Sequence, residues 1–247
     1  MKKTVKNTFK KLWSKKPFRL TVWTLALLVW VWASVTVTQF IVAYPMFWLL
    51  GPEKLQLPVW NAVFSAIVYA LALCLIIFVP YKILKKEKTN REELGLLGWP
   101  TWTDIGLAPI GFVASLLVAQ VFTALFSFFP WFDASEAQDV GFNYLATGSD
   151  RALAFLALVV IAPIAEEIIF RGWLYGKLRR EFGMPLAIFL TSLLFGIVHG
   201  QWNVGVTVFA MSIVLCGLRE VTGTIYSGIL LHMIKNGVAF YFLYIIS

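Results

Sequence analysis

The chain has 247 residues, of which 60% are hydrophobic and only 14% charged, whereas about 25% of residues are charged in an ordinary soluble domain. Its apolar residues are gathered into long blocks, which excludes a soluble globular domain and predicts an all-α fold, a polytopic transmembrane helical bundle. The net charge of +8 indicates contact with anionic lipid headgroups rather than nucleic acid.

Seven apolar blocks are candidates for membrane-spanning helices. The first, Leu20 to Tyr44, has no charged residue over 25 positions, and about 20 helical residues cross a hydrocarbon core. The other six are Val59 to Val79, Ile105 to Phe129, Ala152 to Phe170, Pro185 to Val198, Val204 to Leu218 and Thr224 to Ile246. The spans Pro185 to Val198 and Val204 to Leu218, the fifth and sixth of the chain, are short. We therefore expect a basic segment at residues 1–19 and one membrane domain at 20–247, without the internal repeat that marks many transporters.

Basic and basic-poor loops alternate along the chain. Residues 1–19 carry eight of the 21 Lys and Arg, and the loop from Lys82 to Arg91 carries five. Only Lys54 lies in the loop between these two, and the acidic loop from Asp133 to Asp150 has none. Because Lys and Arg accumulate in cytoplasmic loops, we expect the N-terminus in the cytoplasm and the C-terminus outside, in a bacterial plasma membrane.

Two features that resemble processing or redox signals are better explained by membrane spans. The first apolar run is longer than the hydrophobic region of a signal peptide, and no small-residue cleavage site follows it, so we expect it to be retained. Cys74 and Cys216 both fall within spans, where we expect them to pack as small apolar side chains rather than form a disulfide.

Three clusters of polar residues interrupt the C-terminal half of the chain, and both of its histidines belong to them. They are Glu166, Glu167 and Arg171 in "APIAEEIIFRG"; Phe195 and His199 in "FGIVHG"; and His232, Lys235 and Asn236 in "LLHMIKNG". A charged side chain at bilayer depth costs from a few kcal/mol to more than about 10 kcal/mol, so these residues are candidates for a functional site.

Helical geometry separates the roles of the two carboxylates. Residues four apart share a face, so Glu167 and Arg171 can form an ion pair, which we interpret as mainly structural. Glu166 points about 100° away and has no cation three or four residues from it, which favours a general base. His232 and Asn236 project together, although an intramembrane His or Asn can also simply bind a neighbouring helix.

The patterns Glu-Glu-x-x-x-Arg, Phe-x-x-x-His and His-x-x-x-Asn, in this order on three membrane elements, resemble the CPBP family of intramembrane proteases. That family contains the CAAX prenyl endopeptidases of the Rce1 type and the bacterial Abi proteins. The resemblance covers about residues 150–240, and "EELGLLG" at 92–98 is similar to a loop often seen before the central helices of the family. It implies a membrane endopeptidase acting on a membrane-associated or lipidated peptide or protein.

Carried over by position, the resemblance implies a role for each of four residues. Glu166 is the general base that activates water, and His199 helps to bind and activate that water. His232 and Asn236 polarise the scissile carbonyl and stabilise the oxyanion, as preorganised donors do in a water-poor cavity. Lys235 is an extra charge to which the resemblance assigns no role.

The same residues permit a metal site. Glu166, His199 and His232 are alternative ligands for a catalytic zinc ion. The spacing His-Glu-x-x-His is absent, and zinc-binding histidines usually need a carboxylate or carbonyl partner of their own. We expect Arg171 to occupy Glu167, the one remaining carboxylate of the clusters, so the sequence favours metal-independent hydrolysis without a cofactor.

The predicted topology places two of the site residues at different depths in the membrane, although catalytic partners must lie close together. At about 1.5 Å per helical residue, Glu166 and His199 differ in depth by about 12 Å. The difference disappears if the fourth span continues as a tilted helix to about Arg180, or if the fifth begins deeper. We expect the site in the cytoplasmic half of a cavity open to water.

Two rival functions remain open at this point. A proton-coupled transporter also places Glu, His and Arg in its spans, although repeats or broken helices in matching positions would favour it. A non-catalytic immunity or peptide-binding protein could share the fold, but the intact set of Glu166, His199, His232 and Asn236 argues against lost catalysis.

Overall fold

The computed structural model of the chain describes residues 16–84, 89–136, 142 and 145–246. Within these ranges the backbone forms helices and turns and contains no strand, which confirms the all-α prediction. The elements are α2 (Lys16–Leu55), α3 (Pro58–Leu84), α4 (Trp102–Phe126), α5 (Gly148–Phe155), η1 (Leu156–Ile161), α6 (Ala162–Glu167), η2 (Ile168–Leu174), α7 (Tyr175–Glu181), α8 (Met184–Ile197), α9 (Trp202–Thr222) and α10 (Tyr226–Tyr244). The predicted basic segment 1–19 lies mostly outside the described residues.

Each of the seven predicted spans corresponds to a helical segment. Five are long and apolar enough to cross a membrane, namely α2, α3, α4, the continuous helix Gly148–Glu181 and α9. The remaining two are α8, which is apolar but has only 14 residues, and α10, which carries three polar site residues. The chain is therefore an integral membrane protein with several spans.

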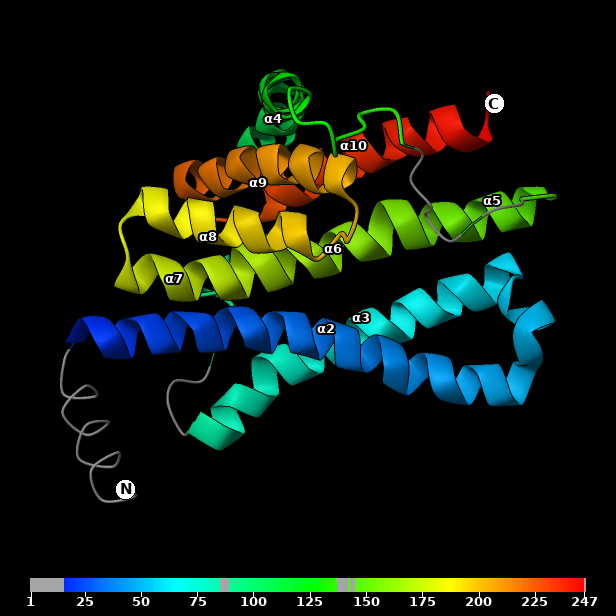
Figure 1. The fold of residues 1–247 in the computed structure, drawn as a ribbon, viewed down its shortest axis with the longest axis horizontal. Helices are drawn as coiled ribbons and strands as arrows, with labels where there is room; N and C mark the ends of the chain where they lie inside the picture. The colour runs from blue at the N-terminus through cyan, green and yellow to red at the C-terminus, as the bar shows by residue number, and fades with distance from the viewer. Residues whose placement is uncertain (1–15, 85–88, 137–141, 143–144, 247) are drawn as a thin grey trace.

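The first two helices form a hairpin on one side of the molecule (Figure 1). The predicted first span is continuous within α2, but α2 extends further, to Leu55. Gly51 has φ 76° and ψ 164°, a backbone conformation that favours glycine, and Pro52 follows it, so the helical path bends there. The chain then turns back into α3, which lies against α2 and against the helix that carries Glu166.

The fourth span is the longest helix of the C-terminal half. It begins after Thr147, whose side chain forms a reciprocal capping box with Asp150, and it runs through α5, η1, α6, η2 and α7 to Glu181. Its 34 residues correspond to about 51 Å, more than the hydrocarbon core of about 30 Å. In Figure 1 this helix crosses the molecule between the α2–α3 hairpin and the group formed by α8, α9 and α10.

This continuity supports the first of the two explanations for the depth difference between Glu166 and His199. The fourth span does not stop at Phe170, where the sequence placed its end, but continues as a helix past Arg180. The short helix α8 then returns along α7, and its end, just before His199, lies near the middle of the long helix (Figure 1). Glu166 and His199 consequently lie close enough for their charges to interact.

The two cysteines are free, as the sequence predicted. Cys216 is buried in α9, and Cys74 is exposed on α3. The predicted packing role therefore fits Cys216, whereas Cys74 lies exposed on an apolar helix.

Candidate active site

Glu166 lies where three helices meet. The Tyr69 hydroxyl of α3 donates a hydrogen bond to Glu166 Oε1 over 2.5 Å. The other oxygen, Oε2, lies 3.8 Å from Nε2 of His232 on α10. The Glu166 side chain is 16% exposed, so one oxygen is held by a neighbour and the other remains available near an imidazole.

Glu167 is fully buried behind this site and binds two partners with one oxygen. Its Oε1 accepts hydrogen bonds from Arg171 Nη1 and from His232 Nδ1, each over 3.0 Å. The predicted ion pair with Arg171 is confirmed, and the Arg171 side chain is only 1% exposed. Arg171 therefore occupies Glu167 as expected, but it does not exclude a second partner, because the same oxygen also binds His232.

The close approach of α10 to Glu167 depends on a glycine. A Cβ added to Gly228 would lie 3.2 Å from Glu167 Oε2, closer than most such contacts. Gly228 is one helical turn before His232, so its small size allows α10 to bring the imidazole to the carboxylate.

Phe195 is the centre of the packing around the second cluster. Its side chain is fully buried, and the Arg171 guanidinium lies 4.2 Å from its ring centroid, which stabilises the buried cation. The His199 ring is 4.9 Å from the Phe195 ring and the His232 ring 6.1 Å, both approximately edge to face. The Phe195 ring thus contacts Arg171 and both histidines.

His199 lies just beyond the end of α8, and its ring orientation is set by the backbone. Nδ1 of His199 is 2.7 Å from the carbonyl oxygen of Phe195, which can only accept, so Nδ1 carries the hydrogen. In the neutral imidazole, Nε2 therefore has a free lone pair. His199 also interacts electrostatically with Glu166 and with Lys235.

Asn236 is bound to the helix of Glu166 through a backbone irregularity. In the π-helix η1, each N–H bonds to the carbonyl five residues earlier, as Ala162 N–H does to Ala157. The next donor in this register would be residue 163, which is a proline and has no N–H. Asn236 Nδ2 donates to the carbonyl of Leu158 over 2.8 Å and satisfies the oxygen that Pro163 leaves unpaired.

The structure brings most of the predicted residues into one centre. Glu166 and His232 face each other, His199 and Lys235 interact electrostatically with Glu166, and Lys235 is only partly buried. Asn236 is one helical turn beyond His232, and its described hydrogen bond goes to Leu158 rather than to Glu166.

Tyr69 is the site residue that the sequence analysis missed. It lies at the middle of the predicted span from Val59 to Val79, whereas membrane tyrosines usually gather at the ends of spans. A mid-span tyrosine was therefore a usable signal, but nothing in the sequence pointed from it to a residue almost a hundred positions later.

Among the described residues, no three His, Cys, Asp or Glu side chains are grouped closely enough to hold a metal ion. The histidines themselves have the anchoring partners that zinc ligands usually have, a carboxylate for His232 and a carbonyl for His199. The placement of the predicted trio Glu166, His199 and His232 does not fit a metal, although the orientation of its two imidazoles is compatible with one.

The centre of this bundle of membrane helices thus holds a pair of adjacent carboxylates, two histidines of set orientation and an asparagine. Residues 148–238 match the family model described as Rce1-like, type II CAAX prenyl endopeptidase. This segment is therefore similar to the Rce1-like family, in agreement with the CPBP resemblance. Searches of the curated proteins and of the solved structures returned no match.

The matched segment contains every predicted site residue but not Tyr69. The described centre thus combines residues of the matched segment with a residue from the N-terminal hairpin.

Proposed function

We propose that this protein is an intramembrane endopeptidase in which Glu166 activates the attacking water. The observation that carries the proposal is the position of its carboxylate. Oε1 is held by Tyr69, and Oε2 is directed toward His232 Nε2 at a separation of 3.8 Å, inside an apolar bundle with limited exposure. A general base must lie within hydrogen-bonding reach of the proton that it abstracts, directly or through one water.

The reaction proceeds in two proton transfers through Glu166. Its carboxylate takes a proton from water while the resulting hydroxide adds to the scissile carbonyl carbon, which gives a tetrahedral oxyanion. When this intermediate collapses, the C–N bond breaks, and the protonated Glu166 returns the proton to the departing amine. The carboxylate is regenerated, and one peptide bond and one water become a carboxyl group and an amine.

His199 holds the water during the first transfer. Because its Nδ1–H is bound to the Phe195 carbonyl, the Nε2 lone pair is the group that can accept a hydrogen bond from water. This arrangement leaves the second water proton to Glu166.

His232 and Asn236 stabilise the oxyanion. Glu167 fixes the His232 ring through Nδ1, so that Nε2 is directed to the side of Glu166, and donation from Nε2 requires His232 to carry a proton on both nitrogens. Asn236 uses one N–H for the Leu158 carbonyl and keeps a second N–H for substrate. Donors held in advance cost no reorganisation when charge develops on the oxygen.

We favour metal-independent hydrolysis over the zinc alternative. If Glu166 were a ligand, the remaining carboxylate Glu167 would have to serve as base, but it is fully buried and its Oε1 already accepts from Arg171 and His232. The proposal predicts well under one equivalent of zinc in purified protein and unchanged peptidase activity after prolonged chelation. Stoichiometric zinc, with activity lost on its removal and regained on its return, would contradict it.

The proposed substrate is a lipidated, membrane-associated peptide, since the matched family model describes prenyl endopeptidases. We propose that the protein acts in a bacterial plasma membrane with its N-terminus in the cytoplasm. The test compares cleavage of a prenylated CAAX peptide with that of the same peptide without the prenyl group, by protein reconstituted into liposomes. We expect faster cleavage of the prenylated peptide, and equal rates would exclude the lipid as a recognition element.

A comparison of membrane proteomes identifies the natural substrate. Cells that express the active protein and cells that express Glu166→Gln should differ in precursor proteins that accumulate only with the variant. A Glu166→Gln protein that retains full biological activity would instead favour the non-catalytic immunity or binding function.

A further inference from the structure

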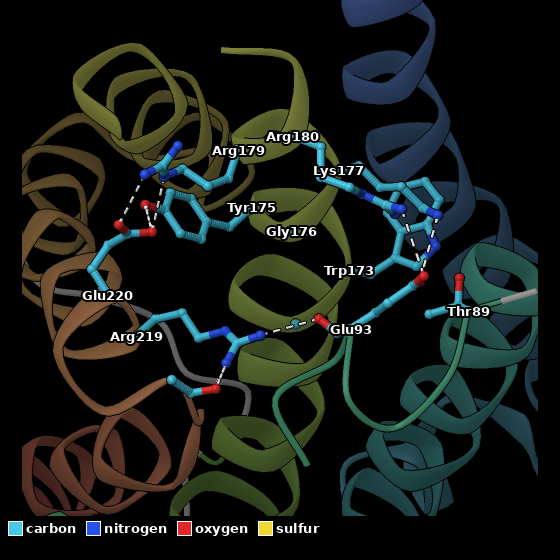
Figure 2. Close-up of a pocket in the computed structure, with 12 residues that line it drawn as sticks. Thr89, Glu93, Trp173, Tyr175, Gly176, Lys177, Arg179, Arg180, Arg219 and Glu220 are labelled. Atoms are coloured by element: carbon cyan, nitrogen blue, oxygen red, sulfur yellow. Dashed lines mark hydrogen bonds and ion pairs between the residues drawn. The ribbon is translucent and has the colours of Figure 1, made fainter. Parts of the chain in front are cut away.

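A cavity of about 370 Å³ lies at the basic end of the long helix, and its lining includes none of the proposed catalytic residues. It is formed by α7, by the end of α9 and by the loop before α4 (Figure 2). Its volume falls within the range of small-ligand sites, about 300–1,000 Å³. The charged side chains in its lining are Lys177, Arg179, Arg180, Arg219, Glu93 and Glu220.

These side chains leave an excess of two positive charges, since four are cations and two are carboxylates. The carboxylates occupy opposite walls, as Figure 2 shows. Glu220 accepts hydrogen bonds from Tyr175 at 2.8 Å and from Arg179 at 3.1 Å. Glu93 lies 3.5 Å from Arg180. The net charge therefore favours an anion in the space between the two walls.

Arg219 lies between the walls and is held by backbone oxygens (Figure 2). Its guanidinium donates to the carbonyl of Glu93 over 3.1 Å and to the carbonyl of Gly223. The neighbouring carboxylate, Glu220, is already bound by Tyr175 and Arg179. A cation whose described hydrogen bonds go only to neutral oxygens retains its full charge for a ligand.

The segment "EELGLLG" at 92–98 forms one side of this cavity, and glycines allow its close approach. Gly95 has φ 70°, and a Cβ there would collide with the Arg219 guanidinium. A Cβ on Gly176 of α7 would lie 3.3 Å from the carbonyl oxygen of Glu93. The glycines thus hold Arg219 and the loop in a fixed geometry, and this segment has a role apart from the catalytic centre.

We propose that this cavity binds the phosphate group of an anionic membrane lipid. Guanidinium groups are suited to phosphate oxygens because their N–H groups form a planar fork. Thr89 in the lining of the cavity belongs to the basic loop that the sequence places at the cytoplasmic surface, where anionic lipids concentrate. A phosphate with one or two negative charges offsets the excess charge of the lining.

Binding is measured on the purified full-length protein in neutral detergent by native mass spectrometry and by thermal unfolding. The probes are phosphatidylglycerol, phosphatidylcholine, which has a phosphate but no net charge, and inorganic phosphate. We expect one tightly retained phosphatidylglycerol and a higher Tm with this lipid. Inorganic phosphate that binds as tightly as the lipid would assign the cavity to a soluble phosphate compound and overturn the lipid proposal, as would equal retention of phosphatidylcholine.

The variant Arg179→Gln locates the site. The Arg179 side chain is 43% exposed, so its loss should affect folding little, and the Tm without lipid checks this. We expect about tenfold weaker phosphatidylglycerol binding, the effect of one lost charge-assisted hydrogen bond. The matched control is Lys54→Gln, which removes the same charge from an exposed position outside the cavity. Equal weakening in both variants, or in neither, would contradict the assignment.

Discussion

Glu167 and Glu166 are adjacent in the sequence but lie in different surroundings. Glu167 is fully buried, and its Oε1 joins Arg171 to His232, whereas Glu166 is partly exposed and bound by a tyrosine. Removing the countercharge of a buried cation strongly destabilises the folded protein. Neutralising a partly exposed carboxylate lowers the free energy of unfolding less. We therefore expect substitutions of Glu167 to lower mainly stability and substitutions of Glu166 to lower mainly catalysis.

The substitution Glu167→Gln should lower the free energy of unfolding by roughly 3–5 kcal/mol, because Arg171 would remain buried without a countercharge. Thermal unfolding in detergent measures the effect. The control is Glu181→Gln, which removes an exposed carboxylate from the end of the same helix and should change stability by less than about 0.5 kcal/mol. A Glu167→Gln protein as stable as this control would show that the buried pair contributes little.

The substitution Tyr69→Phe should reduce kcat for peptide cleavage about tenfold and leave KM unchanged. Phenylalanine keeps the ring but removes the hydroxyl that holds Glu166 Oε1, and a hydrogen bond to a charged group is worth about 1.5–3 kcal/mol. Steady-state kinetics separates the two parameters. Tyr241→Phe, on the exposed side of α10, is the matched control. An unchanged kcat for Tyr69→Phe would remove Tyr69 from the catalytic account.

At the level of the elements, the contact between α8 and α9 positions His199. A Cβ on Gly196 would lie 2.8 Å from the carbonyl oxygen of Gly205, and a Cβ on Gly205 would lie 3.0 Å from that of Gly196. The two backbones therefore touch at a pair of glycines, as in many membrane helix pairs. His199 follows Gly196 by three residues, so a displacement of α8 would move the imidazole.

The substitution Gly205→Ala should lower both the Tm and the cleavage rate, because the added methyl group separates α8 from α9. Thermal unfolding and initial rates measure these effects. Gly217→Ala is the control on the same helix, where a Cβ meets nothing within 4 Å and alanine favours the helix by about 1 kcal/mol. If both variants behaved alike, the close contact would not be what positions His199.

The sequence predicted the helices well because apolar blocks and charged loops are local signals. A polar residue in an apolar block needs a partner, and Glu166 and His232, which the sequence assigned to one site, lie 3.8 Å apart. The apolar block alone placed the end of the fourth span at Phe170, because the basic residues that follow look like a loop unless their partners on other helices are known. The continuation to about Arg180 was indicated only by the difference in depth between Glu166 and His199. The bond from Asn236 to Leu158 was equally hidden, because it depends on a π-helical register.

At the scale of the whole molecule, the alternation of basic and basic-poor loops determines the expected orientation. A reporter that is active only in the cytoplasm should be active when fused near Lys86 and inactive when fused after Ser247. These two positions lie outside the described residues, so the measurement is independent of the fold. Activity at both positions would indicate an even number of spans, and the reverse pattern would invert the orientation.

The central claim, that Glu166 is the base of a membrane peptidase, is tested most directly by the kinetics of Glu166→Gln. The glutamine side chain retains an oxygen that can accept a hydrogen bond from the Tyr69 hydroxyl, but it cannot take a proton from water. Purified wild-type and variant protein are compared in liposomes with the same prenylated peptide, and unfolding in detergent verifies that both are folded. The account predicts a kcat lower by about 10²–10⁴-fold with an unchanged Tm. A folded Glu166→Gln protein that cleaves at the wild-type rate would contradict it.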